Sequence, residues 1–462
     1  MEIGDEEAIL HTDALGMQDL FFRRHSGALY FSVRIDPLLD ISTGQLHTDW
    51  AAWASIAAVT CPLGDATPFE EVRRMIAATA WRARPDKLDQ MSFEPSWLDA
   101  EPGGRVTAAE ALDVVKKHVS KGRRRTVITL SGGWDSRLLA ILARPGRPRM
   151  VAWTTSNDDG RDRDIEYASN VARALRLKHR VLVPDAAAWL REHSVVRRRL
   201  NFQTTHHVWI MPLARVLHTR REQIIDGLGG DVLFKSLFVD RAVVDAANAE
   251  RRRWLLWNSL EQKRLQHPKL LAPKVAAAFE DLSRQSFDRA VRGFDDHPAA
   301  ATLAVLHTRT ARAIASSAQW LLGPEASVRL PFVHPEVIAT ALKVPPDAKI
   351  GGNFYRAMLE AANPRVAALP STNDGKVTGN RGERRQSNDM SLKAMAKSIL
   401  ADQGALRILA PELRLAVRDP NALAVISRSS IGLRLLHWVS MLGEWRARYA
   451  SRLADDGFEV GA

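Results

Sequence analysis

Short runs rich in β-branched and apolar residues alternate with helix-like segments between residues 125 and 239. A run such as Arg125–Leu130 does not alternate polar with apolar residues, which is typical of a strand buried on both faces. The predicted strands cover residues 125–130, 150–154, 180–183 and 222–225, and predicted helices between them cover 136–143 and 164–175. This order of elements indicates an α/β fold with a parallel, doubly wound sheet.

The segments on either side of this region differ from it. Before it, the expected elements are a β-hairpin over Leu20–Val33 with its turn at His25–Gly27, and a short helix over Asp49–Ala58. Residues 66–105 show no clean period. Later helices are expected over 107–120, 246–266 and 303–322, and from Leu392 onward. The first of these begins with a capping box formed by Thr107 and Glu110. A polar loop is expected over 371–388, and no convincing strand after Val239. We therefore expect an α+β domain over residues 1–105, and an α/β domain with a C-terminal helical region over residues 106–462.

Composition limits the class of protein. Hydrophobic residues make up 46% of the 462 residues and charged residues 26%, values typical of a folded chain with more than one core. The 65 basic residues outnumber the 53 acidic ones, and the net charge of +12 indicates an anionic partner without identifying it. Cys61 is the single cysteine, so an internal disulfide and a thiolate zinc cluster are excluded, and a buried structural thiol is expected. The acidic start and the lack of any long apolar run favour a cytoplasmic protein without a membrane span.

The segment Ser131–Ser136, Ser-Gly-Gly-Trp-Asp-Ser, lies between a predicted buried strand and a predicted helix. Glycines there allow the backbone to approach a ligand, and successive N–H groups at a helix N-terminus attract anions such as pyrophosphate. The spacing is not that of the P-loop of NTPases. Asp135 would repel a phosphate unless a Mg²⁺ ion lay between them.

A second glycine cluster, Asp226–Asp231, follows the strand that ends at Ile225. In a parallel sheet both loops open at the carboxyl ends of strands, where ligands bind, so Asp135 and Asp231 could share one metal ion. A glycine turn with a helix cap would explain either cluster alone. The occurrence of two such acid-bearing loops in one sheet is what indicates a ligand site.

These segments carry a resemblance to a known family. The strand followed by Ser-Gly-Gly-Trp-Asp-Ser resembles the pyrophosphate loop of N-type ATP pyrophosphatases, and later segments narrow it to the asparagine synthetase superfamily. Asp226–Asp231 is similar to the family's S-G-x-G-x-D segment. Arg329–His334 is similar to its R-x-P-F-L-D segment, with His334 in place of the acid. A helix and the start of the following strand in the family are similar to the pattern formed here by Asp164, Ala168, Ala172, Leu175 and His179. The resemblance covers roughly Asp13 to Lys376 and is strongest after Thr126.

The resemblance implies that the chain uses ATP and Mg²⁺ to activate a carboxylate as an acyl-adenylate, which an amine then attacks. The resemblance implies that Asp135 and Asp231 bind the metal and that Lys376, Asp231 and Arg356 act in catalysis. The residues that it implies to contact ATP are Leu130, Ser131, Gly132, Gly133, Asp135, Ser136, Trp153 and Gly227. Lys376 matches the family lysine that stabilises the anionic transition state.

The chain also departs from asparagine synthetases. Residue 2 is Glu2 rather than a nucleophilic cysteine, Cys61 lies in mid-chain, and the front domain resembles only part of a glutaminase, so we expect a truncated, inactive glutaminase-like domain. Leu228 stands where asparagine synthetases carry a glutamate for their aspartate substrate. We infer that the amine belongs to the substrate itself and that the reaction is a cyclisation.

Among cyclising relatives, the lasso peptide cyclases fit best, because the front domain is short and 13 tryptophans suit a peptide-binding surface. Trp134, Trp153 and Trp209 are candidates to line the cavity, although core packing is the commoner role of a single tryptophan. The expected partners are a precursor peptide and the leader peptidase and leader-recognition protein of its pathway, with no nucleic acid and no membrane.

Three alternatives stay open at this point: a β-lactam synthetase acting on a small amino acid, an RNA-binding or tRNA-modifying pyrophosphatase, and a non-catalytic scaffold. The net charge motivates the second, although no RNA-stacking motif is evident. The arginine runs 197–199 and 251–253 are interpreted as solvated helix faces, with an acidic-peptide dock as the alternative, and the adjacent His206 and His207 as a poor metal pair.

Overall fold

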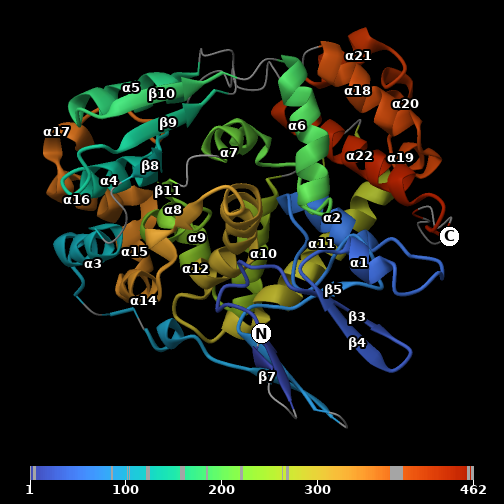
Figure 1. The fold of residues 1–462 in the computed structure, drawn as a ribbon, viewed down its shortest axis with the longest axis horizontal. Helices are drawn as coiled ribbons and strands as arrows, with labels where there is room; N and C mark the ends of the chain where they lie inside the picture. The colour runs from blue at the N-terminus through green and yellow to red at the C-terminus, as the bar shows by residue number, and fades with distance from the viewer. Residues whose placement is uncertain are drawn as a thin grey trace.

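A computed structural model describes residues 2–3, 7–84, 87–100, 102–103, 105–120, 125–156, 162–183, 186–218, 222–262, 264–266, 270–374, 389–454 and 458. Toward one end of the molecule lies a five-stranded parallel sheet in the order β10-β9-β8-β11-β12 (Figure 1). The strands are β8 (Thr126–Thr129), β9 (Val151–Thr155), β10 (Lys178–Leu182), β11 (Gln223–Ile225) and β12 (Ser327–Arg329). The predicted α/β fold class is therefore confirmed.

The strand β12 was not predicted, and the expectation of no strand after Val239 is wrong. β12 has three residues, lies at the edge of the sheet beside β11 and is only partly buried. It therefore lacks the continuous apolar run that identifies a central strand.

Both faces of the sheet are covered by helices. Ile128, Ala152 and Ile225 belong to one core cluster with residues of α4 (Trp134–Ala143) and α5 (Arg163–Ala174). Their neighbours Val127, Trp153 and Ile224 belong to a second cluster with residues of α7 (Met211–Leu217). Successive side chains of a strand point to opposite faces, so these two clusters are the two sides of a doubly wound sheet.

The N-terminal part of the chain contains two antiparallel sheets, β1-β2-β6-β7 and β4-β3-β5. Its elements are β1 (Glu2–Ile3), β2 (Ala8–His11), β3 (Phe21–His25), β4 (Ala28–Ser32), α1 (Asp36–Leu39), α2 (Trp50–Val59), β5 (Arg73–Arg74), β6 (Thr79–Ala83) and β7 (Leu88–Ser92). The predicted hairpin and helix are confirmed, and the hairpin turn has positive φ at Ser26 and Gly27, as a tight two-residue turn requires. β5, β6 and β7 were not predicted. The domain boundary at residue 105 stays a prediction.

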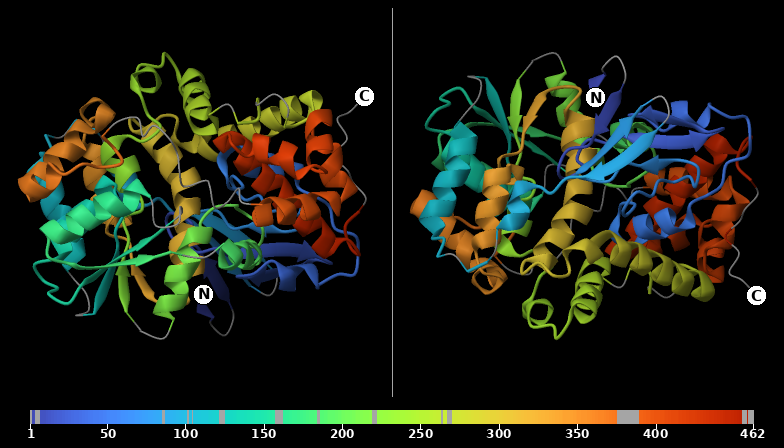
Figure 2. Two further views of the ribbon diagram at one scale, coloured as in Figure 1. Left: turned by 90° about the horizontal axis from the view of Figure 1, so that it is seen from above. Right: turned by 90° about the horizontal axis from the view of Figure 1, so that it is seen from below.

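Helices make up most of the rest of the described chain. They are α3 (Ala108–Ser120), α6 (Ala186–Arg199), α8 (Gly230–Lys235), α9 (Arg241–Val244), α10 (Ala249–Glu261), α11 (Pro273–Val291), α12 (Ala300–Val305), α13 (Ala311–Ile314), α14 (Pro335–Lys343), α15 (Pro346–Lys349), α16 (Asn353–Ala362), α17 (Pro364–Ala367), α18 (Asp389–Leu400), α19 (Gln403–Arg407), α20 (Pro411–Ala416), α21 (Pro420–Ile426) and α22 (Ser430–Tyr449). The capping box of α3 is present, since the Thr107 hydroxyl accepts the Glu110 N–H and the Glu110 carboxylate accepts the Thr107 N–H. The C-terminal helices lie at the end of the molecule opposite the parallel sheet (Figure 2). No helix of the described residues is long and apolar enough to cross a membrane.

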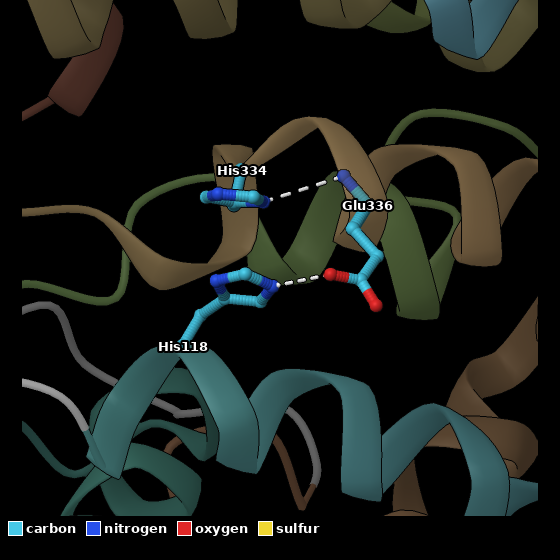
Figure 3. Close-up of side chains that lie close together, drawn as sticks. All are labelled: His118, His334 and Glu336. Carbon is cyan, nitrogen blue, oxygen red and sulfur yellow. Dashed lines mark hydrogen bonds and ion pairs between the residues drawn. The ribbon is translucent and has the colours of Figure 1, made fainter.

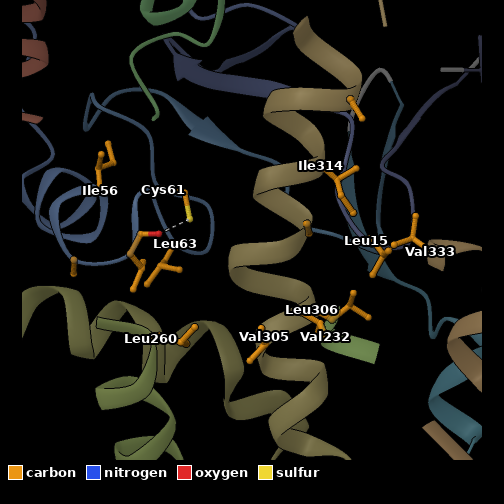
Figure 4. Packing of buried hydrophobic residues seen from close by; sticks show 14 of the residues in the cluster. Leu15, Ile56, Cys61, Leu63, Val232, Leu260, Val305, Leu306, Ile314 and Val333 are labelled. Atoms are coloured by element: carbon orange, nitrogen blue, oxygen red, sulfur yellow. Dashed lines mark hydrogen bonds between the residues drawn. The ribbon is translucent and has the colours of Figure 1, made fainter. Parts of the chain in front are cut away.

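A long helix, residues 300–322, runs between the sheet and the N-terminal part, and two of its stretches, Leu306–Thr310 and Ala315–Leu322, are π-helical. Cys61 packs close to this helix among apolar side chains such as Leu63 and is 6% exposed (Figure 4). The expected buried state of this thiol is confirmed.

Candidate active site

The two glycine loops meet at the carboxyl ends of β8 and β11. A Cβ atom on Gly227 would lie 3.0 Å from Cβ of Asp135 and 3.1 Å from the Ser136 backbone nitrogen. A Cβ atom on Gly230 would lie 2.7 Å from Oδ1 of Asp135. Only glycine allows this approach, which brings the first turn of α8 against the first turn of α4.

This approach brings together the carboxylates of Asp135 and Asp231. Burial raises the pKa of Asp135 well above its usual value, and the neighbouring charge of Asp231 raises it further. Burial also raises the pKa of Asp231, against the opposing influence of Arg309. Tyr355 lies beside Asp135, and burial together with the charge of Asp135 raises the pKa of the Tyr355 hydroxyl. Oδ1 of Asp135 is buried and has no hydrogen-bond partner among the described residues. Two close carboxylates with an unsatisfied oxygen fit a hard divalent cation such as Mg²⁺.

The loop after β8 is held by a set of side-chain oxygens. Gly132 N–H donates to Oδ1 of Asp164 at 2.8 Å, Gly133 N–H to Oγ of Ser131 at 3.2 Å, and Trp134 N–H to Oδ1 of Asn373 at 3.1 Å. The Ser131 and Ser136 hydroxyls are 2.9 Å apart. The predicted phosphate-binding N–H groups are therefore present at the helix N-terminus, but in this state protein oxygens already occupy them. A phosphate bound there would take the place of Asp164 and Asn373 as acceptor.

A basic and aromatic group lies next to this loop. Trp134 is 5% exposed, and Nζ of Lys235 and Cζ of Arg356 each lie 5.2 Å from its ring centroid. A Cβ atom on Gly352 would lie 2.7 Å from this ring, so the backbone covers it closely. Arg356 also lies 3.8 Å from the Asp374 carboxylate. The structure thus places Arg356 near the loop.

Other predicted site residues lie elsewhere or beyond what the structure describes. The Trp153 side chain belongs to the core cluster around α7, with Arg180 5.1 Å from its ring, and only its carbonyl reaches the loop, accepting the Leu130 N–H at 2.9 Å. Trp209 is 39% exposed. Lys376 lies outside the described residues.

His334, which replaces the family acid, caps α14 because its Nδ1 accepts the Glu336 N–H. Its ring stacks on His118 at 3.5 Å, and Nε2 of His118 lies 2.9 Å from the Glu336 carboxylate (Figure 3). A metal ion lies in the plane of each imidazole that binds it, about 2.1 Å from the nitrogen, and two stacked rings share no such point. We therefore interpret these three side chains as a helix-capping cluster. Just before His334 in the chain, Phe332 and Val333 lie against the glycines of the Asp231 loop.

The arginine runs 197–199 and 251–253 are not uniformly solvated. The interpretation of both runs as solvated helix faces is therefore only partly correct. Arg197 is 5% exposed and pairs with Glu444 at 2.9 Å. Arg253 is also largely buried and pairs with Asp295. These cations are neutralised within the fold, so they offer no free charge to a ligand.

Two residues of the site were missed in the sequence. Tyr355 had no signal except its position beside Arg356. Arg309, which is an electrostatic neighbour of Asp231, had only the signal of a basic residue inside a largely apolar helix. Neither residue belongs to a recognisable motif.

The asparagine synthase family model matches residues 109–372, a range that includes both glycine loops. None of the curated proteins compared with the chain matches it. Among solved structures, the chain is similar to the NH3-dependent NAD synthetase from Campylobacter jejuni subsp. jejuni NCTC 11168 in complex with the nitrate ion, with 13% identity and a TM-score of 0.19 over 42% of this chain and 96% of that one.

Proposed function

Because the chain belongs to the asparagine synthase family, which forms amide bonds at the expense of ATP, we propose that it is a peptide cyclase of this type. A side-chain carboxylate of Asp or Glu in a ribosomal peptide attacks the α-phosphorus of ATP, and the bond to the β-phosphate oxygen breaks to release pyrophosphate. The N-terminal amine of the same peptide then attacks the acyl carbon. The bond to AMP breaks, the amine proton passes to solvent, and an isopeptide macrolactam of the lasso type is formed.

The observation that carries this proposal is the meeting of Asp135 and Asp231 across two glycine loops. These carboxylates would hold Mg²⁺, which, when bound, would neutralise negative charge on the phosphates of ATP. Ser131, Ser136 and the N–H groups of the loop would bind the phosphates. Such a site positions reactants, and positioning suits a ring closure that is slow in free solution.

The nature of the nucleophile is inferred from Leu228. This residue packs partly buried against the main core cluster and has no polar group with which to orient a free amino acid. An amine that arrives within the substrate needs no such group. Arg356 and Lys376 are proposed to stabilise negative charge during acyl transfer. The precursor peptide, and the leader peptidase and leader-recognition protein of its pathway, are the proposed partners.

The test uses the purified protein with ATP, Mg²⁺ and leader-free synthetic peptides that carry an N-terminal glycine and one Asp or Glu. We expect AMP and pyrophosphate, together with a peptide that has lost one water. The matched control peptide carries Gln in place of Glu and should give no AMP. Asp135→Ala should abolish AMP formation. Release of ADP, or equal turnover of the Glu and Gln peptides, would reject adenylation of a side-chain carboxylate.

A further inference from the structure

A cavity lies between the N-terminal part of the chain, α11 and the long helix of residues 300–322. We call it the N-terminal cavity, and its volume is about 710 Å³. Sites for small molecules usually have about 300 to 1,000 Å³, so this size fits such a ligand. The residues that line the cavity include none of the two glycine loops, so the proposed reaction centre does not account for it.

Arg74, in β5, lines the N-terminal cavity and has an unsatisfied terminal nitrogen. The residue is 5% exposed and its Nη2 donates to the Gly64 carbonyl, whereas its Nη1 is buried without a hydrogen-bond partner among the described residues. In Arg137, Arg197 and Arg312 the buried atom without such a partner is Nε, and both terminal nitrogens are bonded. A buried donor of a cation costs free energy while it is unpaired, and an acceptor supplied by a ligand would recover that cost.

The buried acids of this region already have other partners. Both carboxylate oxygens of Asp19 accept hydrogen bonds from Arg312, at 2.6 and 3.0 Å. Asp49, which lines the cavity, accepts a hydrogen bond from Arg73 at 2.7 Å. Burial and the charge of Arg312 lower the pKa of Arg74 to about 9, against the opposing charge of Asp19, so Arg74 is still a cation at pH 7. A desolvated cation at the wall of a cavity favours a ligand with a negative charge.

Apolar side chains form much of the cavity wall. Leu15, Leu63 and Met75 line it and are buried. Phe294 also lines it, with its ring centroid 4.7 Å from that of His307. Burial lowers the pKa of His307 to about 4, so this imidazole is neutral at pH 7, and its Nε2 has no hydrogen-bond partner among the described residues. These walls favour a ligand with an apolar body.

Solvent reaches the N-terminal cavity past exposed side chains. Ile76, which lines it, is 47% exposed, and the lining residues Asp65, Glu70 and Arg289 are exposed as well. Because acids as well as cations line the cavity, a ligand with one negative charge fits it better than a dianion such as a phosphate monoester, which the acids would repel more strongly.

We propose that the N-terminal cavity is a second ligand site of this protein, and that it binds a small organic carboxylate with an apolar body. The carboxylate pairs with the Arg74 guanidinium and supplies the acceptor that Nη1 lacks. The apolar body lies against Phe294 and the aliphatic side chains of the wall. This site is additional to the proposed cyclase reaction and does not depend on it.

Calorimetric titration of the full chain, without ATP or peptide, tests the class of ligand. The probes are 3-phenylpropanoate, its neutral amide, the phosphonate with the same aromatic body and a higher charge, and acetate, which lacks the body. We expect 3-phenylpropanoate to bind at least about tenfold more tightly than each of the other three, because only this probe combines one negative charge with an apolar body. Equal binding of the carboxylate and the amide, tighter binding of the phosphonate, or binding of none of the probes would overturn the proposal.

Substitution of Arg74 tests the group that binds the anion. Arg74→Gln should weaken 3-phenylpropanoate binding about tenfold or more and leave the weaker binding of the amide unchanged, because the amide gains nothing from the cation. The matched control is Arg23→Gln, which should bind the carboxylate within about twofold of the wild type. Arg23 is also 5% exposed, lies in β3 beside β5 and donates to two backbone carbonyls, but it does not line the cavity. Equal weakening by both variants would reject Arg74 as the anion-binding group.

A variant that keeps Arg74 tests the location and covers the case in which Arg74→Gln does not fold. Ala290→Leu extends a side chain from α11 into the cavity and should weaken 3-phenylpropanoate binding about tenfold or more. Ala277→Leu, at an exposed position of the same helix outside the lining, should bind like the wild type. Leucine is a good helix former, and thermal unfolding checks that both variants keep the fold. Wild-type binding by Ala290→Leu would overturn the proposed location.

These titrations and the cyclase assay fail independently. The titrations contain no ATP, so a protein that releases no AMP would refute the proposed function and leave the binding results unchanged. Conversely, AMP release without carboxylate-selective binding would refute only the second site.

Discussion

Oδ1 of Asn373 accepts the backbone N–H of Trp134 at 3.1 Å, which joins residues 239 positions apart in the chain. A second contact, from Thr372 N–H to the Gly132 carbonyl at 3.1 Å, lies beside it. The segment after α17 is therefore fastened to the first turn of α4, three residues before Lys376. This contact both caps a helix and holds the segment that leads to the proposed catalytic lysine.

Substitution of Asn373 should separate these two effects. Asn373→Ala removes the acceptor and should lower the free energy of unfolding by about 1 kcal/mol, as the loss of other N-terminal caps does. Asn373→Asp keeps an acceptor at the helix N-terminus, where a negative charge is favourable, so its stability should stay near that of the wild type. The same charge should weaken ATP binding. Thermal unfolding and calorimetric titration with ATP measure the two quantities, and equal destabilisation by both variants would contradict the capping role.

Gly227→Ala should disrupt the site by forcing its two loops apart. The added methyl would lie 3.0 to 3.1 Å from the backbone and Cβ of Asp135 and from the Ser136 nitrogen, none of which is a flexible side-chain end. We expect a loss of AMP formation of about a hundredfold, in line with the effect of displacing reactants by about 1 Å. The matched control is Gly293→Ala, where a Cβ atom has no neighbour within 4 Å. Full activity in Gly227→Ala would show that the close approach of the loops is unnecessary.

The predictable parts of this fold are those that local chemistry determines. The strands β8, β9 and β11 are apolar runs that end in loops, and the capping box of α3 needs only residues three apart. β12 escaped prediction because an edge strand of three partly exposed residues has no distinctive pattern. β7, with the sequence Leu-Asp-Gln-Met-Ser, escaped for the same reason.

Residues of the candidate site were likewise predictable where a local motif identified them, and not where only tertiary packing brings them to the site. Asp135 and Asp231 were found because each belongs to a short glycine motif, and a parallel sheet places both motifs at one edge. Tyr355 and Arg309 approach these acids from helices that are distant in sequence, and only tertiary packing brings them there. The sequence showed that His334 replaces the family acid. It did not show that the His334 ring stacks on His118, because this contact depends on how the last turn of α3 packs against the start of α14.

The ion pair between Asp19 and Arg312 should be the most acid-sensitive contact between the N-terminal part and the long helix. Both side chains are nearly fully buried, with oxygen–nitrogen distances of 2.6 and 3.0 Å. Although burial raises the pKa of Asp19, Arg312 outweighs it, and the net pKa lies below the usual value. This carboxylate therefore contributes stability above the pKa of the unfolded chain, and the contribution is lost as the pH falls through the lower folded-state pKa.

Asp19→Ala should cost about 3 to 5 kcal/mol near pH 7, because it leaves Arg312 buried without a partner. The double variant Asp19→Ala with Arg312→Met removes the stranded charge and should recover a large part of this loss. Urea unfolding of the two variants measures both values. A double variant less stable than the single one would contradict the account.

Lys349 should destabilise the folded protein near neutral pH and not in alkali. Its side chain is fully buried, its Nζ donates to the Ala341 carbonyl at 3.0 Å, and burial lowers its pKa to about 8. Because the folded-state pKa lies below that of the unfolded chain, the stability of the wild type falls as the pH falls from about 10.5 through about 8. Lys349→Met titrates nowhere in this range, so it should gain stability over the wild type as the pH falls, by about 3 kcal/mol in total for a shift of this size. Urea unfolding at several pH values measures the difference, with Lys343→Met, at the exposed end of α14, as the control. A difference between Lys349→Met and the wild type that stays constant from pH 7 to pH 10 would show that the ammonium is not desolvated in the fold.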